Sequence, residues 1–319
     1  MENIYKLDSD SDVLDELWTW LRNRNIEQKF IYFWEWGKLY YQWKFDYNEK
    51  NKTEFLNQNF LDFLEKNNIL NTKQWSSIIS LWCWDSIKEY SILKKLNNKK
   101  INFIWVDSSE KMLEISRKNL KYIKNEKKFL CADFSKKSFR LELEQLTKDN
   151  KNRVFVFFSN TFWNIEHTNI IDILWNLLKK WEKIWLDVVV RKWTWIKNDI
   201  EISKMTSDIV LKKELSDKFF KNTLINLWIN SSSIELFSRV KKENFINSLK
   251  FDFFYYFKDK QEIEIKWEKI IILPWEEIKF LQIYAYERDW FIKFFNEHWF
   301  DFIDSNIKDF RGQFLFQKR

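Results

Sequence analysis

The middle of the chain alternates short apolar segments with segments of helical periodicity, and this alternation limits the fold more than any other feature. We expect strands at 78–81, 102–107, 128–133, 153–160 and 183–190. We expect helices at 86–96, 109–123 and 166–179. Strands that are apolar along their whole length and alternate with helices are typical of a parallel sheet covered on both faces. The predicted fold class is therefore α/β, with a doubly wound, Rossmann-like sheet.

The flanking regions differ from this middle part. Residues 1–75 are predicted to be mainly helical, and 196–250 are predicted to be helical with uneven amphipathicity. Alternating apolar and polar residues predict strands within 251–286. A helix over 287–298 and two closing strands are expected to complete the chain.

Several classes of protein are excluded by composition. No apolar run has the length of a membrane-spanning helix, and the residues after Met1 lack the basic and apolar parts of a signal peptide. Cys83 and Cys131 are too few for a disulfide framework or zinc cluster, and His167 and His298 lack metal-ligand spacing. The net charge of +7 is spread over mixed segments. We therefore expect a cytoplasmic protein with no metal site and no membrane contact. The charge favours lysine-rich coding over a nucleic-acid partner, but an RNA acceptor and the oligomeric state stay open.

The glycine content conflicts with the predicted fold, because the chain has 2 Gly and 1 Pro but 20 Trp. An average chain of this length carries about 22 glycines, and Trp and Gly together reach that number here. A gene rich in A and T explains the loss of Gly, Pro and Ala, but it does not explain the tryptophans, whose standard codon is TGG. Some lineages read the codon TGA as glycine, whereas other codes read it as tryptophan. We hypothesise that most of these tryptophans stand for glycines of the native protein.

The positions of the tryptophans favour this hypothesis. Trp181 and Trp299 each follow a helical segment and precede a strand, where a helix-ending glycine belongs. The segments KKWEK, LPWEE and RDWF place Trp between polar residues, as expected for turns. Trp43, in YYQWKF, is the weakest case, and a genuine tryptophan stays open there.

Three successive strand ends carry residues suited to a nucleotide. The first strand ends in L-W-C-W-D-S (81–86), which becomes L-G-C-G-D-S with glycines restored. Glycines allow a sharp turn and a close approach of the backbone to a ligand. Asp107 follows about 20 residues later, where a carboxylate can accept hydrogen bonds from ribose hydroxyls. The third strand ends at Ala132-Asp133-Phe134, where an acid can accept from an adenine amino group.

With glycines restored, this region resembles the class I S-adenosylmethionine-dependent methyltransferases. More narrowly, it resembles the histidine-specific methyltransferase family of ergothioneine synthesis. The similar segments cover most of the chain: KFIYFWEWGKLY, IISLWCWDSIKEYSIL, FIWVDSSEKMLEIS, FFSNTFWNI, KIWLDVVVRK and PWEEI. The resemblance implies a seven-stranded methyltransferase sheet, S-adenosylmethionine as cofactor and a methyl transfer that needs no catalytic acid or base side chain.

The resemblance also implies a set of site residues. The implied cofactor-binding residues are Trp82, Cys83, Trp84, Lys88, Asp107, Asp133, Phe134 and Asn160. The implied acceptor contacts are Asn164, Tyr32 and Tyr286, although a helix cap for Asn164 and core packing for the two tyrosines stay open as alternatives. In a chain that keeps its tryptophans, the indoles of Trp82 and Trp84 are expected to fill part of the cofactor pocket.

The acceptor half of the resemblance departs from the family. Leu281 and Ile283 stand where the family has a Glu and a Ser, and Phe33 stands where it has an Asp. Aliphatic side chains cannot accept hydrogen bonds from an imidazole. These departures argue against histidine and favour another small molecule, an amino acid or an amine, as the methyl acceptor.

The resulting organisation has four parts. We expect an N-terminal helical substrate segment over 1–75, an S-adenosylmethionine-binding domain over 76–195, a substrate lobe over 196–286, and a closing helix and strands over 287–319. Two other functions stay open. Ser80, at a position where many methyltransferases carry an acid, weakly favours a non-catalytic partner protein. Literal tryptophans would instead favour an aromatic-rich protein that stacks sugars or nucleobases.

Overall fold

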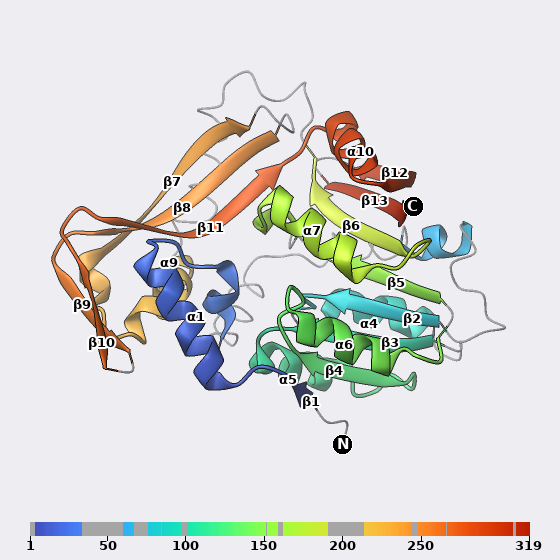
Figure 1. The fold of residues 1–319 in the computed structure, drawn as a ribbon, viewed down its shortest axis with the longest axis horizontal. Helices are drawn as coiled ribbons and strands as arrows, with labels where there is room; N and C mark the ends of the chain where they lie inside the picture. Colours follow the sequence, from blue (N-terminus) through green and yellow to red (C-terminus); the bar gives the residue numbers. More distant parts are fainter. Residues whose placement is uncertain are drawn as a thin grey trace.

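An eight-stranded sheet organises the larger part of the molecule (Figure 1). The computed structural model describes residues 4–33, 60–66, 76–83, 85–96, 101–150, 152–158, 162–190, 214–243, 248–265, 267–308 and 311–319. The strands lie in the order β1 (Ile4–Lys6), β4 (Lys127–Cys131), β3 (Ile101–Asp107), β2 (Ser76–Leu81), β5 (Asn152–Phe157), β6 (Lys183–Val189), β13 (Arg311–Lys318) and β12 (Phe300–Lys308).

The strand order confirms the doubly wound α/β fold, but the described sheet has eight strands instead of the expected seven, because the short strand β1 pairs with β4 at its edge. The strands from β1 to β6 pair in parallel, whereas β13 runs antiparallel between β6 and β12. From β2 the chain moves outward through β3 and β4, and it then crosses to β5 and β6 on the other side of β2. Every residue of β2 and β3 is buried, as expected for strands covered on both faces.

Helices cover both faces of this sheet. One hydrophobic cluster joins the sheet to α6 (Lys137–Leu146), α7 (His167–Leu177) and α10 (Arg288–Glu297). A second cluster joins the opposite face to α4 (Ile87–Lys95), α5 (Glu110–Asn119) and the helical residues 60–66. β1 and α6 were not predicted from the sequence. β1 has only 3 residues, too few for a periodic pattern to be recognised.

A smaller part with its own core stands beside the large sheet (Figure 1). It contains the antiparallel sheet β11 (Glu277–Ala285), β8 (Ser248–Phe257) and β7 (Ile234–Glu243), and the hairpin β9 (Gln261–Ile265) and β10 (Glu268–Ile272). Its core is completed by α1 (Asp10–Arg22), the short helix η1 (Gln28–Tyr32) and α9 (Glu214–Ile225). The two parts meet where Tyr286, after β11, donates its backbone N–H to Val189 at 3.0 Å.

The helical prediction for 196–250 is wrong from residue 234 onward. Residues 234–243 form β7, and β8 begins at Ser248. β7 is the edge strand of its sheet, and most of its side chains are at least partly exposed. Its polar residues therefore hide the two-residue period that marks a half-buried strand. Among the described helices, none is long and apolar enough to cross a membrane.

The tryptophans of the described chain include a group with unusual backbone geometry. Among the described residues, eight other than glycine have positive φ, and six of these are tryptophans with φ between 58° and 73°: Trp82, Trp181, Trp228, Trp267, Trp275 and Trp299. All of these except Trp82 are exposed, and Trp228 and Trp267 are 94% exposed. Bulky side chains rarely adopt this backbone conformation, whereas glycine adopts it without steric cost.

Trp105 and Trp185 form a second group. Both lie in extended strands, are at most 1% exposed and contact phenylalanine rings. The indole N–H of each has no hydrogen-bond partner among the described residues. Their packing is that of core residues, although burial of an unpaired N–H is unfavourable.

Candidate functional site

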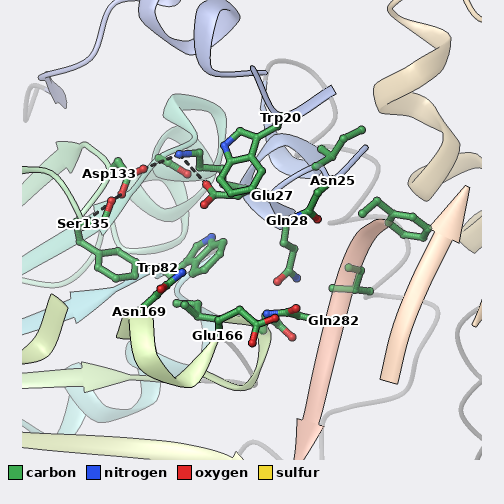
Figure 2. A pocket seen from close by; sticks show the side chains of 18 of the residues that line it. Trp20, Asn25, Glu27, Gln28, Trp82, Asp133, Ser135, Glu166, Asn169 and Gln282 are labelled. Atoms are coloured by element: carbon green, nitrogen blue, oxygen red, sulfur yellow. Dashed lines mark hydrogen bonds and ion pairs between the residues drawn. The ribbon is translucent and has the colours of Figure 1, made fainter. Parts of the chain in front are cut away.

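A cavity of about 210 Å³ opens at the carboxyl ends of β2, β3 and β4. Trp82, Asp107 and Asp133 line it from these three strand ends. Residues 25–29, the start of α7 and the middle of β11 complete its walls (Figure 2). The cavity lies beside β2, where the direction of the strand order reverses. In open α/β sheets, ligands bind in the crevice at this place.

Asp107 is held firmly at the end of β3. Its carboxylate is 2% exposed and accepts the backbone N–H of Ser109 at 2.9 Å. Ser109 caps α5 by accepting the N–H of Met112, and its hydroxyl donates to the carbonyl of Tyr32 at 2.6 Å. These contacts fix an acidic group at the wall of the cavity.

Asp133 takes part in a compact ion cluster. Lys29 Nζ lies 2.6 Å from Asp133 Oδ2 and 2.9 Å from Glu27 Oε2, and it also pairs with Glu16. The other carboxylate oxygen of Asp133 accepts the backbone N–H and hydroxyl of Ser135 at 2.9 and 2.6 Å. Burial alone would raise the pKa of Asp133, but the charge and hydrogen bond of Lys29 outweigh it and hold that pKa below its usual value. Sequence analysis missed Lys29, because 104 residues separate it from Asp133.

Trp82 stands in the middle of the site. It follows β2 with φ of 58° and is 8% exposed. In Figure 2 its indole lies between Asp133 and Ser135 on one side and Glu166 and Gln282 on the other. Phe134 also lines the cavity, with its ring 6.1 Å from the Trp82 ring.

Cys83 follows Trp82 but lies behind the cavity wall. Its backbone N–H donates to Val106 at 3.1 Å. Burial raises the pKa of the Cys83 thiol well above its usual value, so this group is not an activated nucleophile. Trp84, Asn160 and the side chain of Lys88 lie outside the described residues; the backbone of Lys88 belongs to α4.

The predicted acceptor contacts have different surroundings. Asn164, in the short helix η2 (Phe162–Asn164), lines the cavity, and its Oδ1 has no partner among the described residues. Tyr32 and Tyr286 are buried and do not belong to the lining of this cavity. The Tyr32 hydroxyl accepts from Gln28 Nε2 at 3.0 Å, whereas Tyr286 lies against Phe162 and Phe291.

Glu166, just before α7, and Lys279 and Gln282 of β11 line the far end of the cavity. Glu166 Oε1 pairs with Lys250 at 2.5 Å, and its Oε2 accepts the Tyr284 hydroxyl at 2.6 Å. Lys279 Nζ donates to Gln282 Oε1 at 3.1 Å. Burial would raise the pKa of Glu166, but Lys250 and Tyr284 lower it below its usual value.

A β-bulge explains why sequence analysis missed part of this group. The register of β11 against β8 shifts between Lys279 and Leu281. A bulge interrupts the strict alternation of side chains along a strand. As a result, Lys279, Leu281 and Gln282 all line the cavity, so the acceptor end is more polar than Leu281 and Ile283 alone had indicated.

His167 lies behind Glu166 as the first residue of α7. Its ring is 8% exposed and lies 4.0 Å from the Tyr284 ring and 5.4 Å from the Tyr286 ring. Burial lowers the pKa of His167 to about 3. The imidazole is therefore uncharged at neutral pH.

The pKa of His167 predicts an acid-sensitive fold. In the unfolded chain the imidazole of His167 takes up a proton with a pKa of about 6.5, whereas in the folded chain it stays unprotonated until the pH approaches 3. This contribution to stability is complete above that pH and is lost as the pH falls toward the folded pKa. Lowering the pH from 7 to 5 should therefore cost about 2 kcal/mol from this residue alone. Urea unfolding at both pH values measures it, and His167→Phe should show a smaller loss. An equal loss in the variant contradicts the prediction.

Comparisons with known proteins give a likeness of fold. No family model and no curated protein matches the sequence. A similar solved structure is an S-adenosylmethionine-dependent methyltransferase from Clostridium acetobutylicum, 12% identical with a TM-score of 0.47, covering 88% of this chain and 98% of that one. Another is magnesium protoporphyrin IX methyltransferase from Synechocystis, 8% identical with a TM-score of 0.42, covering 83% of this chain and 82% of that one.

A third similar structure is 1,6-didemethyltoxoflavin-N1-methyltransferase from Burkholderia thailandensis. It is 6% identical with a TM-score of 0.39, and the match covers 84% of this chain and 89% of that one. At these identities the likeness concerns the fold alone.

Proposed function

We propose that the protein is an S-adenosylmethionine-dependent methyltransferase that acts on a small molecule. The observation that carries this proposal is the convergence of Trp82, Asp107 and Asp133, from three neighbouring strand ends, on one cavity. Asp107 would accept the ribose hydroxyls of the cofactor, and Asp133 would accept its adenine amino group. The left-handed turn at residue 82 would let the backbone approach the rest of the cofactor.

The chemistry of the far end supports an amine or amino acid as the methyl acceptor. Gln28 Oε1 and Asn164 Oδ1 are buried oxygens without a hydrogen-bond partner among the described residues. Both residues line the cavity. An acceptor that carries N–H groups would satisfy these oxygens, and buried polar atoms are rarely left unpaired.

The proposed reaction depends on positioning. When bound, S-adenosylmethionine supplies the methyl group, and an unprotonated nitrogen displaces the sulfur from it. Gln28 and Asn164 would orient that nitrogen, and the apolar wall formed by Phe134, Phe280 and Leu281 would exclude water. The chain needs no acid or base at the reacting atoms, since the nitrogen loses its proton to solvent after transfer.

We further infer that the six tryptophans with positive φ stand for glycines, written as tryptophan by reading TGA under a different code. Their backbone conformation is one that favours glycine, and five of the six side chains are exposed. Trp82 matters most, because its indole takes up space in the cavity where the cofactor would lie. Glycine at this position would make room for the cofactor.

Calorimetric binding of S-adenosylhomocysteine tests both proposals. One protein is the chain as written, and the other carries glycine at all six positions. We expect binding by the glycine form and binding that is weaker by at least about 10-fold in the chain as written. A chain with glycine at the five exposed positions and Trp82 retained is the matched control, and it should not gain affinity.

The outcomes separate the two proposals. If a folded glycine form does not bind S-adenosylhomocysteine, the methyltransferase proposal fails and a partner protein without cofactor is favoured. If the chain as written binds equally well, glycine at residue 82 is refuted while the methyltransferase proposal stands. Circular dichroism establishes that each form is folded.

A further inference from the structure

We propose that Lys279 binds an acidic group, a carboxylate, on the methyl acceptor and thereby selects acidic small molecules. This inference rests on the proposed function and names the chemistry of its acceptor. It follows from the position of Lys279 at the far end of the cavity, from its hydrogen-bonding capacity and from the charges around it.

The backbone of Lys279 is fixed from both sides. On one side it pairs with Phe254 of β8. On the other side its N–H donates to the carbonyl of Arg24 at 3.1 Å, and its carbonyl accepts the N–H of Ile26 at 2.7 Å. The adjacent bulge keeps Lys279 and Gln282 on the same cavity wall. A side chain whose backbone is held this rigidly can recognise a ligand.

The ammonium group of Lys279 has more N–H donors than the hydrogen bonds it makes to described residues. It donates to Gln282 Oε1, but Glu166 Oε1 is 3.8 Å away, too far for a hydrogen bond. Glu166 is already engaged by Lys250 and Tyr284, one at each oxygen. An ammonium carries three N–H donors. Within the described chain, Lys279 therefore keeps hydrogen-bonding capacity for a ligand.

The electrostatic surroundings favour an anion at this place. The charged groups that face Lys279 are Glu166, the residue before α7, Lys250 and Asp252 from β8, and Lys241 from β7. Burial lowers the pKa of Lys279, Lys250 lowers it further, and Asp252 and Glu166 do not compensate. A carboxylate beside Lys279 would supply the missing negative charge. The N-terminus of α7, whose residues Glu166 and Asn169 line the same cavity, adds positive potential.

The arrangement also indicates where the acid stands relative to the reacting nitrogen. Gln282, the partner of Lys279, lies across the cavity from Asp133, with Trp82 between them (Figure 2). The transferred methyl would lie near residue 82, between the cofactor end and the acceptor end. The acceptor would therefore carry its amine toward residue 82 and its carboxylate toward β11.

Matched pairs of acids and amides test this inference. The probes are 4-aminobutyrate and 4-aminobutanamide, succinate and succinamide, and benzoate and benzamide. Each is titrated calorimetrically into the full-length form that binds S-adenosylhomocysteine, with that nucleotide present and absent. At least one acid should bind about 10-fold more tightly than its amide, the equivalent of one charge-assisted hydrogen bond.

Variants assign the preference to Lys279. Lys279→Met should remove the preference for the acid while S-adenosylhomocysteine binds as before, and Lys279→Arg should retain it. Lys293→Met is the matched control, since Lys293 of α10 is 56% exposed, lies outside the cavity lining and changes the net charge equally when it is lost. Equal or absent binding of both members of all three pairs overturns the inference. Preference for the amides overturns it as well, because it would show that this end of the cavity disfavours an anion. If the folded glycine form, with Lys279 retained, does not bind S-adenosylhomocysteine, the proposed function is refuted instead.

Discussion

Replacing Trp181, Trp228, Trp267, Trp275 and Trp299 with glycine should raise the free energy of unfolding by about 5 kcal/mol. All five have positive φ, between 64° and 73°, and side chains that are at least 60% exposed. A left-handed backbone at a bulky residue costs about 1–3 kcal/mol, because Cβ approaches the following carbonyl oxygen. Glycine removes this cost but adds about 0.4–1 kcal/mol of unfolded-state entropy. The balance is a gain of about 1 kcal/mol per position.

Urea denaturation of single and combined variants measures this gain. Trp105→Gly is the control, because Trp105 is fully buried in the extended strand β3, with its ring 5.1 Å from the Phe129 ring. Loss of this side chain should cost about 3–5 kcal/mol. If the five exposed replacements also destabilise the protein, the inference that glycine belongs at these positions is contradicted.

The strands of the large sheet could be predicted because burial on both faces leaves a direct mark on the sequence. β3 and β6 begin and end within one residue of their predicted bounds. β7 left no such mark, because an edge strand with exposed charged side chains does not need to be apolar. The predictable elements were therefore those whose environment admits only one kind of side chain.

The same contrast holds in the candidate site. Asp107 and Asp133 could be proposed from the sequence, because carboxyl ends of neighbouring parallel strands meet at one edge of a sheet. Lys29 and Lys279 could not, since they reach the cavity from segments distant in the chain. The place of Lys279 in the cavity wall also depends on a β-bulge, which the alternation of residues in β11 does not reveal.

Asp107→Asn should weaken the binding of S-adenosylhomocysteine by about 100-fold, close to 3 kcal/mol. The carboxylate would make charge-assisted hydrogen bonds to two ribose hydroxyls, and the amide retains one oxygen acceptor. That oxygen can still accept the N–H of Ser109, so the start of α5 should be preserved.

Asp187→Asn is the matched control, since Asp187 is equally buried, at 2% exposed, but lies within β6 and outside the cavity lining. Calorimetry on the glycine form compares the two variants. Unchanged affinity in Asp107→Asn, or an equal loss in Asp187→Asn, would remove Asp107 from the cofactor site and leave the cavity without its ribose-binding group.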